Sequence, residues 1–147
     1  MIIDGSTLFS TAQVLTTAAR STNILDLVNP RDIGVGDKPP LKIVVKVDTT
    51  FQSTDAGTLT IQVQGSTDGS TWDVYAQSPA IAKTALVAGA QFVIDMPAVA
   101  PGKSLPRYVS LNYAKTLGDW TTGAVTAFMV LDAQQNRAYS AGVIVTN

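Results

Sequence analysis

The chain has 147 residues, of which 46% are hydrophobic and only 14% are charged, and its formal net charge is −1 at pH 7. This length is typical of one domain with a single hydrophobic core. The absence of cysteine and histidine excludes disulfides, thiolate chemistry and imidazole, the commonest metal ligand. The weak net charge argues against nucleic acid as a partner.

The N-terminal sequence MIIDGSTLFS does not predict a secretory signal, because Asp4 stands where such a signal carries positive charge. No segment approaches the roughly 20 apolar residues that span a bilayer. We therefore expect synthesis in the cytoplasm and no membrane partner. Low charge combined with many apolar residues suggests that another protein covers part of the surface; alternatively, Ser and Thr hydroxyls keep a sandwich soluble.

The first 20 residues differ from those that follow, and we expect them to form an N-terminal arm. Ser10 and Gln13 have the spacing of a capping box, and Phe9 and Val14 that of a hydrophobic staple, which favours one or two helical turns. The flanking Ser and Thr residues disfavour a helix interior and favour an extended arm instead.

From residue 23 onward, apolar and polar residues alternate with the period of β-strands. The expected strands cover residues 23–27, 41–48, 58–64, 72–76, 92–96, 107–114 and 123–131. A turn-rich stretch separates 41–48 from 58–64, and these two strands are expected to pair as an antiparallel hairpin. A single helical turn is expected before Gly89.

Two features refine this pattern. Asp68 and Gly69 favour a tight turn, and Trp72, just beyond it, is expected to cover the end of the core rather than to stack on a ligand. The strand 123–131 is apolar on both faces, which predicts that one face packs on the core and the other against a partner or a terminal arm.

The predicted fold class is all-β: an antiparallel two-sheet sandwich of the jelly-roll type. The expected organisation is an N-terminal arm over residues 1–20, the sandwich over 21–135 and a C-terminal tail over 136–147.

Candidate catalytic and metal-binding groups are few. The aspartates lie mostly in turns or at strand ends, where solvated turn residues are expected rather than paired acid–base catalysts. Asp48 with Asp55, or Asp68 with Asp73, would each offer two oxygen ligands to calcium, but neither pair lies in a dense series of oxygen ligands. Serine nucleophiles lack a histidine base. We expect no enzyme, no cofactor and no metal.

Three aromatic residues are candidates for a carbohydrate-binding platform, namely Tyr75, Tyr108 and Trp120. The preferred interpretation is that they are single exposed aromatics or anchors of a protein interface. A carbohydrate-binding module of an adhesion component is therefore kept as the alternative function.

Six segments in their order along the chain carry a family resemblance: STNILDLVNPRDIG, QGSTDGSTW, SPAI, LVAG, RYVSLNY and GAVTAFMVLDAQ. Together they resemble the small capsid cement, or decoration, proteins of short-tailed bacteriophages, of the type described for a Bordetella phage. The resemblance covers residues 21–135. It implies a jelly-roll homodimer without catalytic residues, which sits on the outer surface of the virion capsid and bridges neighbouring major capsid proteins.

If the resemblance holds, the protein acts by mechanical adhesion to two partners, the major capsid protein and a second copy of itself. Residues 1–20 and the QNRAYSAG tail are the expected contact elements; alternatively, both termini fold back on the sandwich. The residues expected to contact the capsid or the second copy are Phe9, Val14, Leu15, Arg31, Asp32, Trp120, Phe128 and Tyr139.

Overall fold

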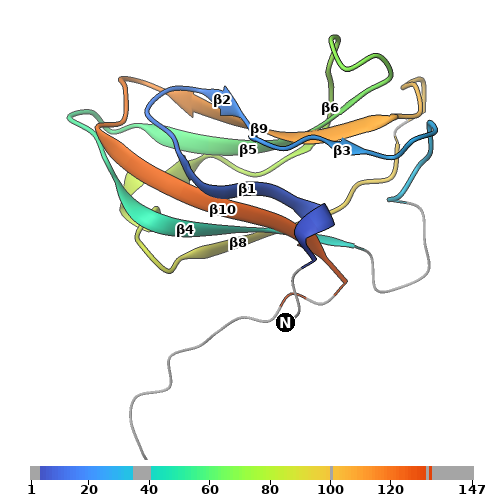
Figure 1. The fold of residues 1–147 in the computed structure, drawn as a ribbon. Coiled ribbons are helices and arrows are strands. Elements are labelled where there is room, and N and C mark those ends of the chain that lie inside the picture. Colours follow the sequence, from blue (N-terminus) through green and yellow to red (C-terminus); the bar gives the residue numbers. More distant parts are fainter. Residues whose placement is uncertain (1–3, 35–40, 100, 132, 134–147) are drawn as a thin grey trace, which may run out of the picture.

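The computed structural model describes residues 4–34, 41–99, 101–131 and 133. They form two antiparallel sheets packed face to face, which Figure 1 shows edge-on. The lower sheet has the strand order β1-β10-β4-β8 and the upper sheet the order β2-β9-β5-β6, with β3 paired to β9 and β7 to β5. Within the described part of the chain, no helix has the length and apolar character needed to cross a membrane.

The strands are β1 Leu8–Val14, β2 Ala19–Arg20, β3 Leu25–Asp26, β4 Lys42–Gln52, β5 Thr58–Ser66, β6 Asp73–Gln77, β7 Ile81–Ala82, β8 Gln91–Asp95, β9 Tyr108–Thr116 and β10 Thr122–Val130. Two short 3₁₀ turns, η1 Gly5–Thr7 and η2 Lys83–Ala85, complete the elements. The η2 turn corresponds to the helical turn expected before Gly89.

The strand pairing is nested along the chain. β5 pairs with β6, β4 with β8, β2 and β3 with β9, and β1 with β10, all antiparallel. A ribbon of nested antiparallel pairs that wraps into two facing sheets is a jelly roll. The predicted all-β sandwich is therefore confirmed.

The period-two pattern correctly predicts the inner faces of the strands. Alternate side chains of β4, β5, β9 and β10 are fully buried between the sheets, because successive residues of a strand point to opposite faces. Burying an aliphatic side chain of this kind contributes about 1.5–3 kcal/mol. The central core residues are Ile43, Val45, Val47, Ile61, Val63, Val109, Leu111, Tyr113, Val125 and Ala127.

The expected hairpin between 41–48 and 58–64 is wrong. β4 pairs with β10 and β8, whereas β5 pairs with β9, β6 and β7. The connection over 53–57 carries the chain from one sheet to the other, so the apolar faces of β4 and β5 both face the core between the sheets. Alternation defines which face of a strand is buried, but it does not define the neighbouring strand.

The segment expected as an N-terminal arm contributes strands to both sheets. Residues 8–14 form β1, paired with β10, and residues 19–20 form β2, paired with β9. Ser10 and Gln13 do not cap a helix: the Ser10 hydroxyl donates to Gln13 Oε1 at 2.7 Å in an irregular, bulged stretch of β1. The sandwich thus begins before residue 20, and the expected tail over 136–147 lies outside the described residues.

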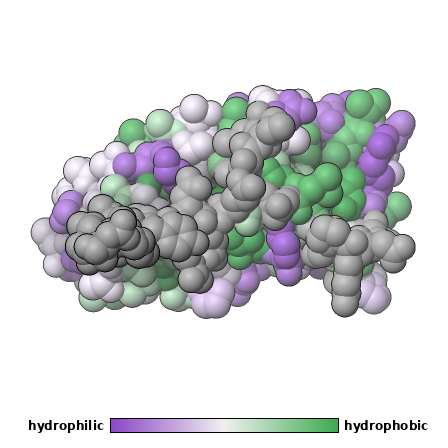
Figure 2. Space-filling model, turned by 90° about the horizontal axis from the view of Figure 1, so that it is seen from below, coloured by the Kyte–Doolittle hydropathy of each residue, from purple (hydrophilic) through white to green (hydrophobic). Residues whose placement is uncertain are grey.

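β10 is buried on both faces, as its sequence predicts. On its outer side, Phe128 and Val130 form a cluster with Val44 of β4. Leu8, at the start of β1, and Ala133, just after β10, pack against this cluster. Figure 2 looks onto this face and shows hydrophobic residues gathered near its centre. The outer face of β10 is therefore covered in part by residues near the two ends of the described chain, namely Leu8 and Ala133.

Candidate interaction surfaces

Three of the four carboxylates considered as calcium ligands, those of Asp48, Asp68 and Asp73, are engaged by neighbouring side chains or backbone. Asp48 accepts a hydrogen bond from the Thr126 hydroxyl at 2.6 Å, and Asp73 pairs with Lys103 at 2.6 Å. Among the residues that the structure describes, no three His, Cys, Asp or Glu side chains are grouped so that they could hold a metal ion. Asp48 and Asp73 therefore have structural partners within the sandwich.

Asp68 organises the turn between β5 and β6. Its carboxylate accepts the backbone N–H groups of Ser70 and Thr71, both at 2.8 Å, and the Ser66 hydroxyl at 2.9 Å. The N–H of Thr71, followed by the bonds from Ser70 and Ser66, lowers the pKa of Asp68 well below its usual range, since these bonds favour the charged form. The next residue, Gly69, has a φ of +76°. The lowered pKa of Asp68 is therefore explained by the hydrogen bonds through which its carboxylate forms the turn.

A pocket of about 310 Å³ lies beside this turn and is lined by Asp68, Asp73, Tyr75 and Ser104, among others. The Tyr75 hydroxyl donates to the Ser104 carbonyl at 2.7 Å. Burial, with a smaller contribution from Asp73, raises the pKa of Tyr75. The polar groups of the pocket thus hold the β6 hairpin against the loop before β9, and none of them is paired as nucleophile and base.

Trp72 does not cover the end of the core as expected. Its neighbour in β6, Val74, pairs with Gln64 of β5, and both lie on the outer face of the β2-β9-β5-β6 sheet. The guanidinium carbon of Arg20 lies 4.0 Å from the centre of the Trp72 ring, and Arg20 Nη2 donates to Gln64 Oε1 at 3.2 Å. This is a cation–π contact on an outer sheet face.

The surroundings of Arg20 and Trp72 are polar but uncharged. Asn112 Nδ2 donates to Gln62 Oε1 at 2.8 Å, and Gln64 Nε2 donates to the same oxygen at 3.3 Å. Gln62 Nε2 in turn donates to Gln77 Oε1 at 3.3 Å. A row of side-chain amides therefore runs across β9, β5 and β6 and leads to the guanidinium of Arg20.

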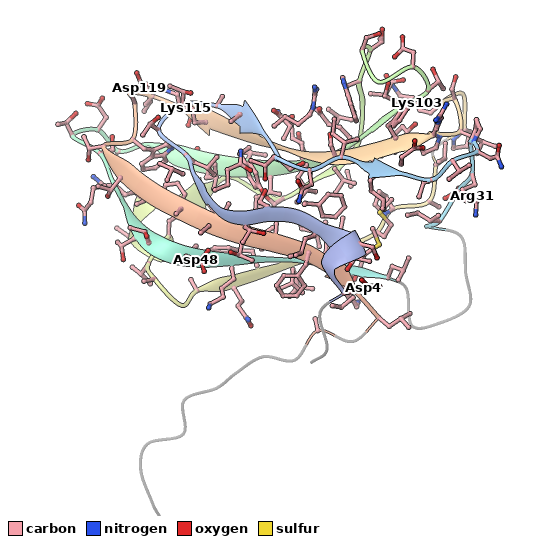
Figure 3. All side chains as sticks on the ribbon, in the orientation of Figure 1. Asp4, Arg31, Asp48, Lys103, Lys115 and Asp119 are labelled. Atoms are coloured by element: carbon pink, nitrogen blue, oxygen red, sulfur yellow. The ribbon has the colours of Figure 1, made fainter. Side chains whose placement is uncertain are left out.

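Exposed apolar side chains occur at both ends of the sandwich. At one end the loops after β1 and β9 are joined by the bond from Trp120 N to Thr16 O, and Val14 and Leu117 are 67% and 68% exposed there. At the other end Arg31 N donates to Pro106 O, and Val28 is 69% exposed. Figure 3 shows Lys115 and Asp119 at the first end and Arg31 and Lys103 at the second.

The residues predicted to make capsid or dimer contacts fall into two groups. Phe9, Leu15 and Trp120 are at most 2% exposed and lie in the core, so they stabilise the sandwich and offer no surface to a partner. Phe128 is buried in the outer cluster with Val44. These four predictions are wrong as surface contacts. The pairing of β1 with β10 encloses Phe9 and Phe128, and the bonds from Leu15 N to Gly123 O and from Trp120 N to Thr16 O hold the other two residues at the core.

The other predicted contacts differ in exposure. Val14 and Arg31 are exposed and remain available to a partner. Asp32 is half-buried and holds its own loop, since its carboxylate accepts the N–H groups of Gly34 at 2.9 Å and Val99 at 2.8 Å. Tyr139 lies outside the described residues.

The proposed sugar platform does not form. Trp120 packs edge-on against Phe51 in the core, with ring centres 5.2 Å apart and an interplanar angle of 79°. Tyr108 lies under the Arg107 guanidinium at 4.8 Å. The three aromatics Tyr75, Tyr108 and Trp120 therefore have separate structural roles. The sequence pattern does not predict the contact of Arg20 with Trp72, because the arm expected over residues 1–20 includes Arg20 and places it in no sheet.

Comparison with known protein families adds a further observation. The Bbp16 family model matches residues 9–129, which extend from β1 to β10 and thus include both sheets. The chain belongs to the Bbp16 family. Bbp16 is the name of a Bordetella phage protein, so the resemblance noted in the sequence is confirmed at the level of the family. No curated protein matches the chain.

Proposed function

We propose that this Bbp16-family protein is a capsid cement protein, which binds the outer surface of a phage head and stabilises contacts between major capsid proteins. The observation that carries the proposal is the match of residues 9–129 to a family named after a phage protein, over the same segments that resemble cement proteins. The partners would be the major capsid protein and a second copy of this chain.

The distribution of exposed apolar side chains supports a bridging role. Val14 and Leu117 at one end, and Val28 at the other, are each more than 60% exposed. We take these exposed apolar side chains as the candidate contact points with the capsid. Two contact sites at opposite ends would allow one rigid sandwich to touch two capsid subunits.

The proposed mechanism is adhesion. A protein that binds the assembled shell but not the separated subunits stabilises the shell by mass action. A symmetric dimer doubles the attachment points, and the second attachment then benefits from the high effective concentration created by the first. Weak individual contacts therefore suffice to resist the pressure of a packaged genome.

We also propose that the protein is not an enzyme. The sequence has no histidine and no cysteine, and the polar groups of the pocket beside Asp68 are used to hold a turn and a loop. These polar groups hold the β5–β6 hairpin and the β8–β9 connection in place, so no catalytic role is needed to explain them.

The test is co-sedimentation of the purified protein with expanded phage heads that lack it. Cement function predicts saturable binding at a copy number related to the symmetry of the head, and increased resistance of the heads to heat. Absence of binding would contradict the proposal. Binding to a glycan array together with no binding to heads would instead support a carbohydrate-binding module.

A further inference from the structure

Arg20 reaches across the outer face of the β2-β9-β5-β6 sheet. Its backbone is held by pairing with Asn112 of β9 and by the bond from Gln13 Nε2 to its carbonyl at 2.8 Å. Since neighbouring strands are about 4.8 Å apart, the side chain must cross β9 to reach Gln64 of β5 and the ring of Trp72 beyond it. The contact therefore joins the two ends of this sheet's strand order.

The charge of Arg20 has no carboxylate partner among the described residues. Five other cations in that part of the chain do have one: Lys42, Lys46, Lys103, Arg107 and Lys115. The side chains next to Arg20 are the amides of Gln62, Gln64 and Asn112. The guanidinium is thus a positive charge on a neutral sheet face.

Three polar atoms at this place have neither a hydrogen-bond partner nor significant solvent contact: Arg20 Nε, Trp72 Nε1 and Ser110 Oγ. Ser110 pairs with Gln64 in the sheet register and so lies on the same face. All three groups can donate a hydrogen bond, and a buried donor without an acceptor costs free energy. An incoming group rich in acceptor oxygens would relieve that cost.

We infer that Arg20 and Trp72 bind an aspartate or glutamate carboxylate of the major capsid protein, an inference that rests on the proposed function. Stacking on the indole holds the guanidinium plane, and its N–H edge then matches the two oxygens of a carboxylate. Because the donors are screened from solvent in the free protein, the Arg20 side chain shifts along the ring to admit the carboxylate. Arg and Trp are also the residues most enriched at the energetic centres of interfaces.

The decisive experiment measures binding of Arg20→Gln to expanded heads that lack the protein. The amide removes the charge and keeps hydrogen-bonding capacity, and we expect at least about a tenfold loss of affinity. The affinity of the wild type should fall more steeply with added salt than that of the variant, because salt screens charge pairs. Lys46→Gln is the matched control, since it removes a cation, 48% exposed, from β4 in the other sheet and should leave affinity unchanged.

Two further variants separate this role from a purely structural one. Arg20→Lys keeps the charge but loses the planar fork and should recover only part of the affinity. Trp72→Phe keeps an aromatic face and removes the N–H donor, and it should bind several-fold more weakly than the wild type. Thermal unfolding of each variant identifies any loss that reflects an unfolded protein.

The outcomes separate this inference from the proposed function. If the wild type binds heads and folded Arg20→Gln binds equally well with the same salt dependence, the carboxylate site is refuted and the cement function stands. If the wild type does not bind heads at all, the cement function is refuted, and so is the proposed contact with a capsid carboxylate. A loss of affinity confined to the Arg20 and Trp72 variants supports the site.

Discussion

The Tyr113 hydroxyl of β9 lies 2.8 Å from Ser10 Oγ of β1, so that a hydrogen bond inside the core joins one sheet to the other. Both residues are completely buried. Ser10 Oγ also contacts Gln13 Oε1, which in turn accepts the backbone N–H of Thr22 at 3.0 Å. The N-terminal strand is thus held in the sandwich by a polar network as well as by its apolar side chains.

This network predicts an asymmetry between two substitutions. Ser10→Ala leaves the Tyr113 hydroxyl buried without a partner and should lower the free energy of unfolding by about 1–3 kcal/mol. Tyr113→Phe removes the hydroxyl itself, while Ser10 keeps Gln13, and should cost only about 1 kcal/mol. Urea unfolding of both variants and of the double variant measures these values. A larger cost for Tyr113→Phe than for Ser10→Ala would contradict this asymmetry.

The same tyrosine predicts a loss of stability at high pH. Burial raises the pKa of Tyr113 above its ordinary value of 10.0, because the charged form is poorly solvated in the core. The unfolded chain therefore ionises first. Stability should be unaffected by this group below pH 10.0 and should fall above it, by at most about 1.4 kcal/mol per pH unit.

Urea midpoints between about pH 9 and pH 11.5 test this dependence. Tyr113→Phe should show a shallower decline, and the remaining slope should include a contribution from Tyr75, whose pKa is also raised by burial. Identical slopes for the wild type and the variant would mean that Tyr113 ionises as easily in the folded protein as in the unfolded chain.

Gly123 is required by the packing of the core beneath β10. Its φ is +150°, and a Cβ atom at this position would lie 2.3 Å from Cδ1 of Phe51, whose ring packs against Trp120. Gly123→Ala should therefore lower the free energy of unfolding by about 1–3 kcal/mol. Gly5→Ala is the control, because a Cβ there meets no atom within 4 Å. Equal effects of the two substitutions would contradict the close packing.

The Asp68 turn predicts a dependence on acid. The pKa of Asp68 is lowered from 3.8 by the hydrogen bonds of its turn, so its contribution to stability is present above pH 3.8 and is lost as the pH falls below it. Asp68→Ala should lower the melting temperature at neutral pH. The difference between wild type and variant should shrink on acidification; a constant difference would assign the effect to side-chain size alone.

Substitutions at the exposed end formed by the loops after β1 and β9 should weaken binding to phage heads without changing the stability of the protein. Val14→Ser and Leu117→Asn remove exposed apolar side chains, and Asn tolerates the positive φ of 56° at position 117. Each should weaken binding to heads several-fold and leave the melting temperature unchanged. Val93→Ser, which changes a 40% exposed residue on the outer face of β8, is the control. Unchanged binding of both variants would exclude this end as a capsid contact.

The sequence by itself determined the class of fold and the buried face of most strands. Ile43, Val45 and Val47 share one face of a strand through a local period of two, and no distant residue is needed to assign that face. The ordered segments from residue 21 to residue 135 were also sufficient to predict a relationship to a phage protein. Both inferences depend on short-range patterns, which a sequence displays directly.

Only the tertiary structure decided which strands are neighbours and which residues are buried by long-range contacts. β4 pairs with β10, about 80 residues later, instead of with β5, because closure of the nested ribbon and not alternation selects partners. The same closure buries Phe9, Leu15 and Trp120, and it brings Arg20 from the N-terminal region to Trp72 beyond β5. Such contacts join positions far apart in the chain, and no local period encodes them.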